Sequence, residues 1–177
     1  MTEHPTDAPD WFQQYTTLAR NDHWITVAGA SIHYQSWNDQ EAKPGLLFVH
    51  GHAAHAHWWD FIAPAFIDKY KVAAMDMSGA GDSDHRDEYS ADLYAQEIVA
   101  VADKCSMGPD TILVSHSYGG IMSIRAVAQY PDRFKGLILL DSGVKHPDDV
   151  TPPEPDRLTR AKSYPTSEIA RSRFRLQ

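Results

Sequence analysis

The fold of this chain is decided by one stretch, Thr111-Ile-Leu-Val-Ser-His-Ser117-Tyr-Gly-Gly120-Ile-Met-Ser123. It begins as an apolar run typical of a buried strand, passes through small residues and continues with helix-like sequence. A sharp turn from strand to helix tolerates little bulk two residues before and two residues after its central residue. Ser115 and Gly119 hold those positions around Ser117, and Gly120 lets the helix pack closely on the strand. The stretch therefore predicts a nucleophile elbow that projects the Ser117 hydroxyl into a cleft.

One position departs from the usual pattern of this turn, which is G-x-S-x-G. Ser115 stands where the first glycine is expected, and we interpret it as a tolerated variant because serine is small. A serine at Ser117 is also typical of a helix N-cap, so the pentapeptide alone leaves a capping role and a nucleophilic role open. The neighbouring segments decide between them.

Strands and helices alternate on both sides of the turn. Apolar or β-rich runs predict strands at residues 24–27, 32–37, 46–50, 71–75, 111–115 and 136–140, and helices are expected at 58–70, 91–107 and 118–130. The last four strands are nearly all apolar, which is typical of parallel strands covered by helices on both faces. The first two form an antiparallel hairpin that turns at Gly29. The pattern predicts an α/β fold with a mostly parallel sheet of about six strands flanked by helices.

Composition limits the functions open to this chain. It has 177 residues, 42% of them hydrophobic, and a net charge of −8 that disfavours nucleic acids and anionic lipid surfaces as partners. No apolar stretch reaches the roughly 18 residues of a membrane span, and the acidic, proline-containing start does not resemble a signal peptide. Cys105 is the single cysteine, so no intrachain disulfide forms. We expect a soluble cytoplasmic protein, and the oligomeric state stays open.

The character of the sequence changes after Val144. Residues 145–165 contain five prolines among many charged residues, which predicts an excursion instead of another strand and helix. A short helix is expected after Thr166. We therefore divide the chain into a core at residues 1–144 and a separate segment at residues 145–177.

Two further motifs occur in order before the elbow. Leu46-Leu-Phe-Val-His50-Gly51-His52 is a strand ending in His-Gly, and Ala74-Met-Asp76-Met-Ser-Gly79-Ala-Gly81-Asp-Ser83 is a glycine-rich loop after the next strand. With the elbow, these motifs resemble the serine-nucleophile branch of the α/β-hydrolase superfamily. The resemblance implies an α/β-hydrolase fold in which residues 145–177 begin a helical cap or lid. It also implies that the chain is truncated before the last strands of the fold.

The resemblance assigns roles to three residues. Ser117 is the expected nucleophile toward an ester or other acyl-type bond, and the backbone N–H groups of His52 and Tyr118 form the expected oxyanion hole. No cofactor and no metal is implied, and the expected partner is a small-molecule substrate. Serine argues against haloalkane dehalogenases and epoxide hydrolases, which resemble this fold but attack through aspartate. Asp76 is expected to organise its loop without taking part in the chemistry.

The catalytic base is the missing part of this picture. The family order is serine, acid, then histidine, yet only His146 follows Ser117, and it lies on the proline-rich segment. His116 belongs to the elbow itself, and its side chain is expected to point away from Ser117. Asp141 is a candidate for the orienting acid, although a turn-capping role is favoured. We therefore expect an N-terminal piece of a longer hydrolase, inactive alone, whose strand at 136–140 is an exposed apolar edge.

Two alternative functions remain. The missing base motivates a non-catalytic binding protein of the same fold. A metal-dependent hydrolase is less favoured: the histidine cluster approaches the H-x-H-x-D-H arrangement of metallo-β-lactamase-like hydrolases, but Ala54 replaces the aspartate and the elbow is left unexplained. The cluster comprises His50, His52, His55 and His57. The aromatic residues that follow it are candidates for a pocket lining, with core packing as the favoured alternative; they are Trp58, Trp59 and Phe61.

Overall fold

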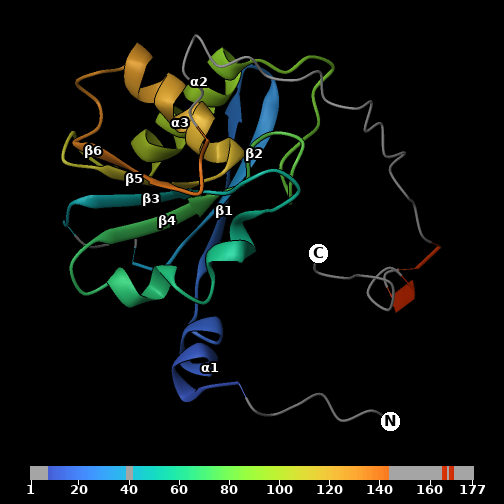
Figure 1. Ribbon diagram of the computed structural model, residues 1–177, viewed down its shortest axis with the longest axis vertical. Helices are drawn as coiled ribbons and strands as arrows, with labels where there is room; N and C mark the ends of the chain where they lie inside the picture. Colours follow the sequence, from blue (N-terminus) through green and yellow to red (C-terminus); the bar gives the residue numbers. More distant parts are fainter. Residues whose placement is uncertain (1–7, 39–41, 144–164, 167, 170–177) are drawn as a thin grey trace. The chain divides into compact units, whose positions relative to one another are not determined.

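A computed structural model describes residues 8–38, 42–143, 165–166 and 168–169 of the chain. Within this part, six strands form one sheet in the order β1-β2-β4-β3-β5-β6 (Figure 1). The strands are β1 (Asn21–Val27), β2 (Ala30–Ser36), β3 (Gly45–Val49), β4 (Lys71–Met75), β5 (Ile112–His116) and β6 (Gly136–Leu140). The β1–β2 and β2–β4 pairs are antiparallel, and the remaining pairs are parallel. The predicted mostly parallel α/β sheet is therefore confirmed.

Helices flank this sheet on both faces. They are α1 (Asp10–Thr16), α2 (Ala91–Lys104), α3 (Tyr118–Gln129) and the 3-10 helices η1 (Ala56–Trp59) and η2 (Ala63–Phe66). Figure 1 shows α2 and α3 together over one face, with η1 and η2 on the other. The helix α2 begins after Ser90, whose Oγ accepts the Leu93 N–H at 3.2 Å, as its sequence predicts. The helix α1 was not predicted, and none of its residues is buried.

The predicted helix at residues 58–70 is wrong. The structure places two separate 3-10 turns, η1 and η2, in this region. Pro64 lies at the start of η2, where it has no N–H to donate and disfavours the helical conformation of Ala63 before it. A continuous α-helix cannot pass through this position, so the segment folds as two short turns.

The central strands separate two hydrophobic cores. Successive side chains of β3 point to opposite faces, so that Leu47 and Val49 pack on the side of α2 and α3. Leu46 and Phe48 pack on the side of η1 with Trp59. All residues of β3 and β4 are buried, which explains why their sequences are nearly continuous apolar runs.

The hairpin between β1 and β2 turns where the sequence predicts. Ala28 and Gly29 form a two-residue connection between the paired residues Val27 and Ala30. Both connecting residues have positive φ, 45° for Ala28 and 84° for Gly29. Two positive φ values are the signature of a type I′ turn, whose twist matches that of antiparallel strands.

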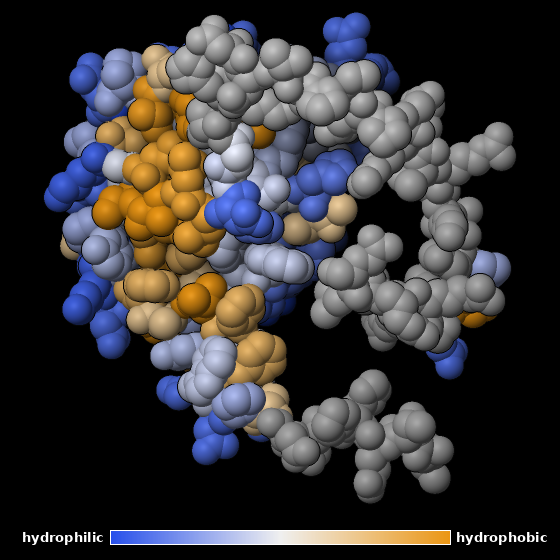
Figure 2. Space-filling view, viewed as in Figure 1, coloured by the Kyte–Doolittle hydropathy of each residue, from blue (hydrophilic) through white to orange (hydrophobic). Residues whose placement is uncertain are grey.

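The last strand, β6, has an apolar sequence like that of the buried strands but is not itself buried. Its side chains are substantially exposed, with Ile138 at 47%, Leu139 at 38% and Leu140 at 40%. Among the described strands β6 lies at the edge of the sheet and pairs only with β5. Figure 2 shows apolar surface gathered on the side of the molecule where β6 lies. The expected exposed apolar edge is confirmed.

Beyond residue 143 the structure describes only four residues. The chain divides into two compact units, Met1–Val144 and Lys145–Gln177. In the second unit Glu168 and Ile169 are helical, and Thr166 Oγ1 accepts the Ile169 N–H at 3.3 Å. The expected cap at 145–164, including His146, lies outside the described residues. No described helix has both the length and the apolar character of a membrane span.

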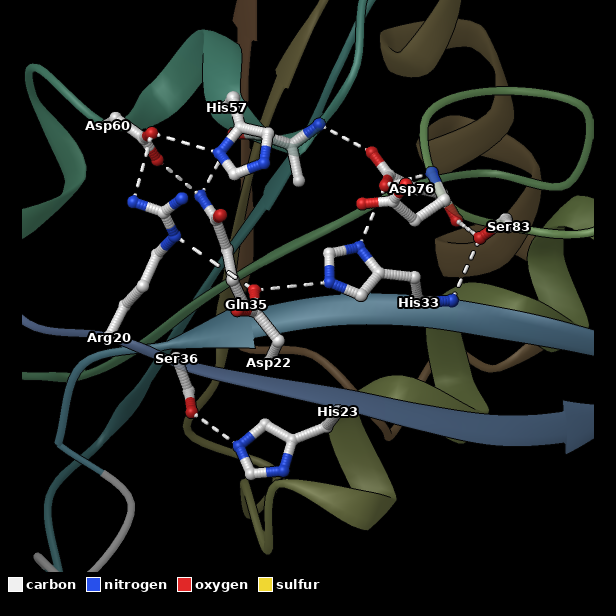
Figure 3. A network of polar contacts seen from close by, with 12 residues as sticks. Arg20, Asp22, His23, His33, Gln35, Ser36, His57, Asp60, Asp76 and Ser83 are labelled. Carbon is white, nitrogen blue, oxygen red and sulfur yellow. Dashed lines mark hydrogen bonds and ion pairs between the residues drawn. The ribbon is translucent and has the colours of Figure 1, made fainter.

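The loop after β4 is held by the carboxylate of Asp76, which is 1% exposed. Its Oδ2 accepts the His33 Nδ1–H at 2.8 Å and the Asp82 N–H at 3.0 Å, while Oδ1 accepts the Ala56 N–H (Figure 3). A side chain at Gly81 would collide with this carboxylate. The hydrogen bonds confirm that Asp76 organises its loop, and they tie the loop to η1 and to β2.

His33 extends this network to the edge of the sheet. Its Nε2 lies 3.3 Å from Asp22 Oδ1 on β1, and its ring contacts the exposed Trp24. Burial by itself lowers the pKa of His33, but the hydrogen bonds and negative charges of Asp76 and Asp22 outweigh it and raise the pKa above 6.5. Burial raises the pKa of Asp76, but the donors from His33, Asp82 and Ala56 outweigh it and lower that pKa below 3.8.

These shifts predict a pH-dependent contribution to stability. The raised pKa means that protonated His33 stabilises the fold fully below pH 6.5, and this stabilisation is lost as pH rises through the higher folded pKa. The Asp76 contribution is present above its ordinary pKa and is lost only as pH falls through its lowered value. His33→Gln should therefore lose about 3 kcal/mol of unfolding free energy near pH 6 and about 1 kcal/mol near pH 9.

Urea unfolding at the two pH values measures this difference. Asp76→Asn removes the charge that faces His33 and is the matched variant. In the double variant the two losses should not add, because each substitution breaks the same pair. A loss from His33→Gln that is equal at both pH values would contradict the assignment of a charged pair.

Candidate active site

Ser117 lies at the sharp turn between β5 and α3. Its backbone has φ 49° and ψ −119°, a conformation that costs about 1–3 kcal/mol for a residue with a side chain. Two hydrogen bonds hold the turn, one from the Ser117 N–H to the Leu140 carbonyl at 2.9 Å and one from the Gly120 N–H to the Ser117 carbonyl at 3.0 Å. The bond to Leu140 means that the end of β6 helps to fix the turn.

The contacts around the turn explain why small residues flank Ser117. A Cβ on Gly119 would collide with the carbonyl oxygen of His50 at the end of β3, so only glycine fits there. Ser115 is fully buried, and its Oγ is 2.7 Å from the Ser123 Oγ on α3. Serine is accommodated in place of the usual first glycine because α3 supplies a partner for its hydroxyl.

The side chain of Ser117 faces the loop that follows β3. A Cβ built on Gly51 would lie 3.1 Å from the Ser117 Cβ, so the two residues are in close apposition. Ser117 is partly exposed, and no described residue forms a hydrogen bond with its hydroxyl. The serine hydroxyl is therefore free to meet a ligand beside this loop.

His50 fixes the loop after β3 and is 2% exposed. Its Nδ1–H donates to the Gly51 carbonyl at 2.8 Å, and its Nε2 accepts the Met77 N–H at 3.1 Å. Burial lowers the pKa of His50, so the ring stays neutral with the proton on Nδ1. It joins the loops after β3 and β4, a role that the sequence does not indicate, because there His50 belongs to a cluster of candidate metal ligands.

His52 and Tyr118 meet at this loop. His52 is exposed, Tyr118 is the first residue of α3, and their ring centroids are 6.3 Å apart in an edge-to-face arrangement. No described residue accepts a hydrogen bond from the main-chain N–H of either one. The structure thus brings the predicted oxyanion residues together beside the turn that carries Ser117, and leaves both donors open.

A cavity of about 410 Å³ opens next to these residues, within the usual size range of ligand sites. The loops after β3 and β4 and the start of α2 form its walls, and Ser117 is not among the lining residues. Ser117 is instead adjacent to two of them, Tyr118 in sequence and Gly51 in space.

The aromatic candidates Trp58, Trp59 and Phe61 do not line this cavity. Trp59 is 4% exposed and packs on Phe48 with ring centroids 5.0 Å apart, so it belongs to the core. Trp58 is exposed, and its ring stacks on His116 at 6.1 Å. Phe61 stacks on a ring of α1.

No described histidine is placed as a base for Ser117. The His116 ring stacks on Trp58, and its Nδ1 is buried with no hydrogen-bond partner among the described residues. His146 lies outside the described part of the chain. Asp141 follows β6, is exposed and has a positive φ of 51°, which is typical of an aspartate in a turn.

The four histidines at positions 50–57 do not assemble into a metal site. Both ring nitrogens of His50 are engaged, and His57 Nδ1 lies 2.9 Å from Asp60 Oδ2. Among the described residues, one group has at least three ligand atoms within 4.8 Å of one another, and it comprises His33, Asp76 and Asp82. A proton on His33 Nδ1 already fills the position between that ring and the Asp76 carboxylate.

The chain is similar in sequence and in fold to known proteins. The chain is 27% identical over 141 residues to a cis-3-alkyl-4-alkyloxetan-2-one decarboxylase of Shewanella oneidensis, covering 77% of this chain and 43% of that protein. It is 31% identical over 140 residues to epoxide hydrolase 1 of Caenorhabditis elegans, and the match covers 77% of this chain and 32% of that protein. The crystal structure of the Cif epoxide hydrolase from Acinetobacter nosocomialis superposes on this chain with a TM-score of 0.62 and 26% identity. The superposition covers 70% of this chain and 38% of that protein.

The chain spans less than half the length of these relatives. The profile of the family described as "alpha/beta hydrolase fold" matches residues 44–168, which include the loop after β3, the loop after β4 and the turn at Ser117. The open turn, the paired loops and this match lead to one conclusion: the chain belongs to the alpha/beta hydrolase fold family.

Proposed function

We propose that this chain is the N-terminal part of a serine hydrolase that cleaves an ester or other acyl-type bond in a small-molecule substrate. The observation that carries the proposal is the strained turn at Ser117, which presents a hydroxyl without a partner among the described residues. A costly backbone conformation persists only where its surroundings enforce it, and such strain concentrates at functional sites. A single cysteine, Cys105, leaves no intrachain disulfide and favours a reducing, cytoplasmic location.

The proposed reaction proceeds in two steps. Ser117 Oγ attacks the carbonyl carbon, loses its proton to a histidine base and expels the leaving group, which takes up that proton. The N–H groups of His52 and Tyr118 stabilise the negative oxygen of each tetrahedral intermediate, and one such donor is typically worth about 3–4 kcal/mol. Water then attacks the acyl-enzyme and restores the Ser117 hydroxyl.

The relatives support hydrolysis in general, and the residue at the turn supports the acyl chemistry. Their names describe a decarboxylase, epoxide hydrolases and an esterase or lipase, so the names alone do not select one reaction. Serine forms an ester with an acyl group, and water cleaves that ester in the second step. Ser117 therefore favours carbonyl substrates over epoxides for this chain.

We further propose that the active protein extends beyond residue 177. A base for Ser117 is absent from the described residues, and the relatives are more than twice as long as the matched region. The exposed β6 adjoins an apolar hollow of about 300 Å³ that Ile138 and Leu140 line together with Ile62 and Phe66. Additional strands and helices packed on this surface would bury it and bring the missing histidine to the cleft.

Two alternatives have their own motivation. A non-catalytic binding protein of this fold agrees with the absence of a base near Ser117. A metal-dependent hydrolase receives less support, because His50 uses both ring nitrogens within the protein.

Fluorophosphonate labelling tests the nucleophile. A product extended past residue 177 that supplies a later histidine should be modified once, because an activated serine attacks the phosphorus centre. Ser117→Ala should abolish the adduct seen by intact mass, and Ser142→Ala, a serine close to the turn, should retain it. Absence of labelling in the extended product would favour the binding protein.

Turnover of an aryl ester tests whether the 177-residue chain is complete. We expect its hydrolysis of p-nitrophenyl acetate to match that of Ser117→Ala, because serine without a base is a weak nucleophile. A rate well above that of Ser117→Ala would show that the base lies within these residues and would overturn the proposed extension. A further loss in His116→Ala would then identify that base.

A further inference from the structure

One wall of the cavity beside Ser117 is a continuous series of aromatic rings. Tyr89 and Tyr94 stack with centroids 6.0 Å apart and an interplanar angle of 22°. Tyr94 and Tyr118 meet edge to face at 6.0 Å, and Tyr118 meets His52 in the same way at 6.3 Å. All four residues line the cavity. The wall therefore runs from the start of α2 to the residues beside the proposed nucleophile.

The rings are fixed by their surroundings. Gly79 has a positive φ of 83°, and a Cβ there would lie 2.7 Å from the Tyr89 hydroxyl, so glycine leaves the space that Tyr89 occupies. The same hydroxyl accepts the Arg86 N–H at 3.0 Å. Burial raises the pKa of Tyr94 to about 12, so that ring carries a neutral phenol at physiological pH.

The buried hydroxyl of Ser78 lacks a hydrogen-bond partner among the described residues. Ser78 is 3% exposed and lines the cavity, and its Oγ is buried without a hydrogen bond in the described part of the chain. Its main chain is fixed, because the Ser78 N–H donates to Glu97 Oε2 at 3.0 Å and its carbonyl accepts the Tyr94 hydroxyl at 3.5 Å. An unsatisfied buried hydroxyl is costly, and a hydrogen bond from a ligand group would remove that cost.

The cavity offers a ligand no buried ionic partner among the described residues. No lysine, arginine, aspartate or glutamate lines it; of its three histidines, His50 is neutral with both ring nitrogens engaged, and His52 and His55 are exposed. The nearby Arg86 is occupied by Glu97 at 2.9 Å and by the carbonyls of Val27 and Ala28. A charged ligand group would lose its hydration without gaining a counter-charge, so an uncharged group is favoured.

We propose that this cavity binds an uncharged aryl group with one hydrogen-bonding substituent. The ring lies against the wall of Tyr89, Tyr94 and Tyr118, and the substituent bonds to the Ser78 hydroxyl. As a statement about substrate, this rests on the proposed function, because it places the aryl group beside the carbonyl that Ser117 attacks. As a statement about binding, it requires no reaction and no base.

Calorimetry with probes that share one ring tests the preference of the 177-residue chain for neutral ligands. The probes are 4-hydroxyphenylacetamide, 4-hydroxyphenylacetate and tyramine, which are neutral, anionic and cationic near pH 7. The neutral amide should bind saturably and about tenfold more tightly than either ion. Tighter binding of tyramine would indicate a cation–π site and overturn the proposal, as would tighter binding of the carboxylate or no saturable binding of the amide.

Two variants test the assigned contacts. Ser78→Ala should weaken 4-hydroxyphenylacetamide about fivefold and leave phenylacetamide, which lacks the ring hydroxyl, unchanged. Tyr89→Leu replaces an exposed ring and should lower the affinity for both probes by about the same factor. Because Tyr89 is exposed, this variant tests the site even if Ser78→Ala does not fold. Equal affinities of the wild type and Tyr89→Leu would contradict binding of the aryl group by the aromatic wall.

A third variant separates this inference from the proposed function. Ser117→Ala should retain full affinity for the neutral probe, because the contacts assigned to it do not include Ser117. Binding without fluorophosphonate labelling of the extended product would leave the aryl site standing and remove the serine chemistry. Labelling without binding of the neutral probe would leave the serine chemistry standing and remove the aryl site.

Discussion

The close approach of α3 to the end of β3 is the constraint on which the site depends. Gly119 lies against the carbonyl oxygen of His50 with no space for a side chain, so the chain must leave β5 through a sharp turn. That turn places Ser117 at φ 49° and directs its side chain toward Gly51. The cost of the strained conformation is met by packing on both sides of the turn. A bulkier residue at either glycine would move the serine and the loop together.

Two buried polar residues then set the position of the loops around Ser117. His50 is neutral and joins the loop after β3 to the loop after β4 through its two ring nitrogens. Asp76 is ionised and gathers donors from β2, η1 and its own loop. Neither group faces the cavity as a reactive group, yet each fixes backbone that lines it. Buried polar networks of this kind specify a single arrangement because every alternative leaves a polar group unsatisfied.

The sequence predicted those features that depend on local sterics. The turn around Ser117, the hairpin at Gly29 and the loop role of Asp76 follow from small or turn-forming residues at fixed spacing, and the structure has each of them. The helix expected at 58–70 from apolar spacing does not form, because Pro64 interrupts it. The hydrogen bonds of His50 and Ser78 could not be predicted from the sequence. His50 bonds to Met77, 27 residues away, and Ser78 bonds to Glu97, 19 residues away.

By itself the sequence determined the α/β class, the mostly parallel sheet and the turn that carries Ser117, since alternation of apolar runs and placement of glycine act over a few residues. Tertiary packing was needed to place Trp59 in the core and to bring three tyrosines into one wall. These outcomes depend on which surfaces meet after the chain has folded. Residues far apart in sequence then share one environment, and spacing along the chain carries no record of it.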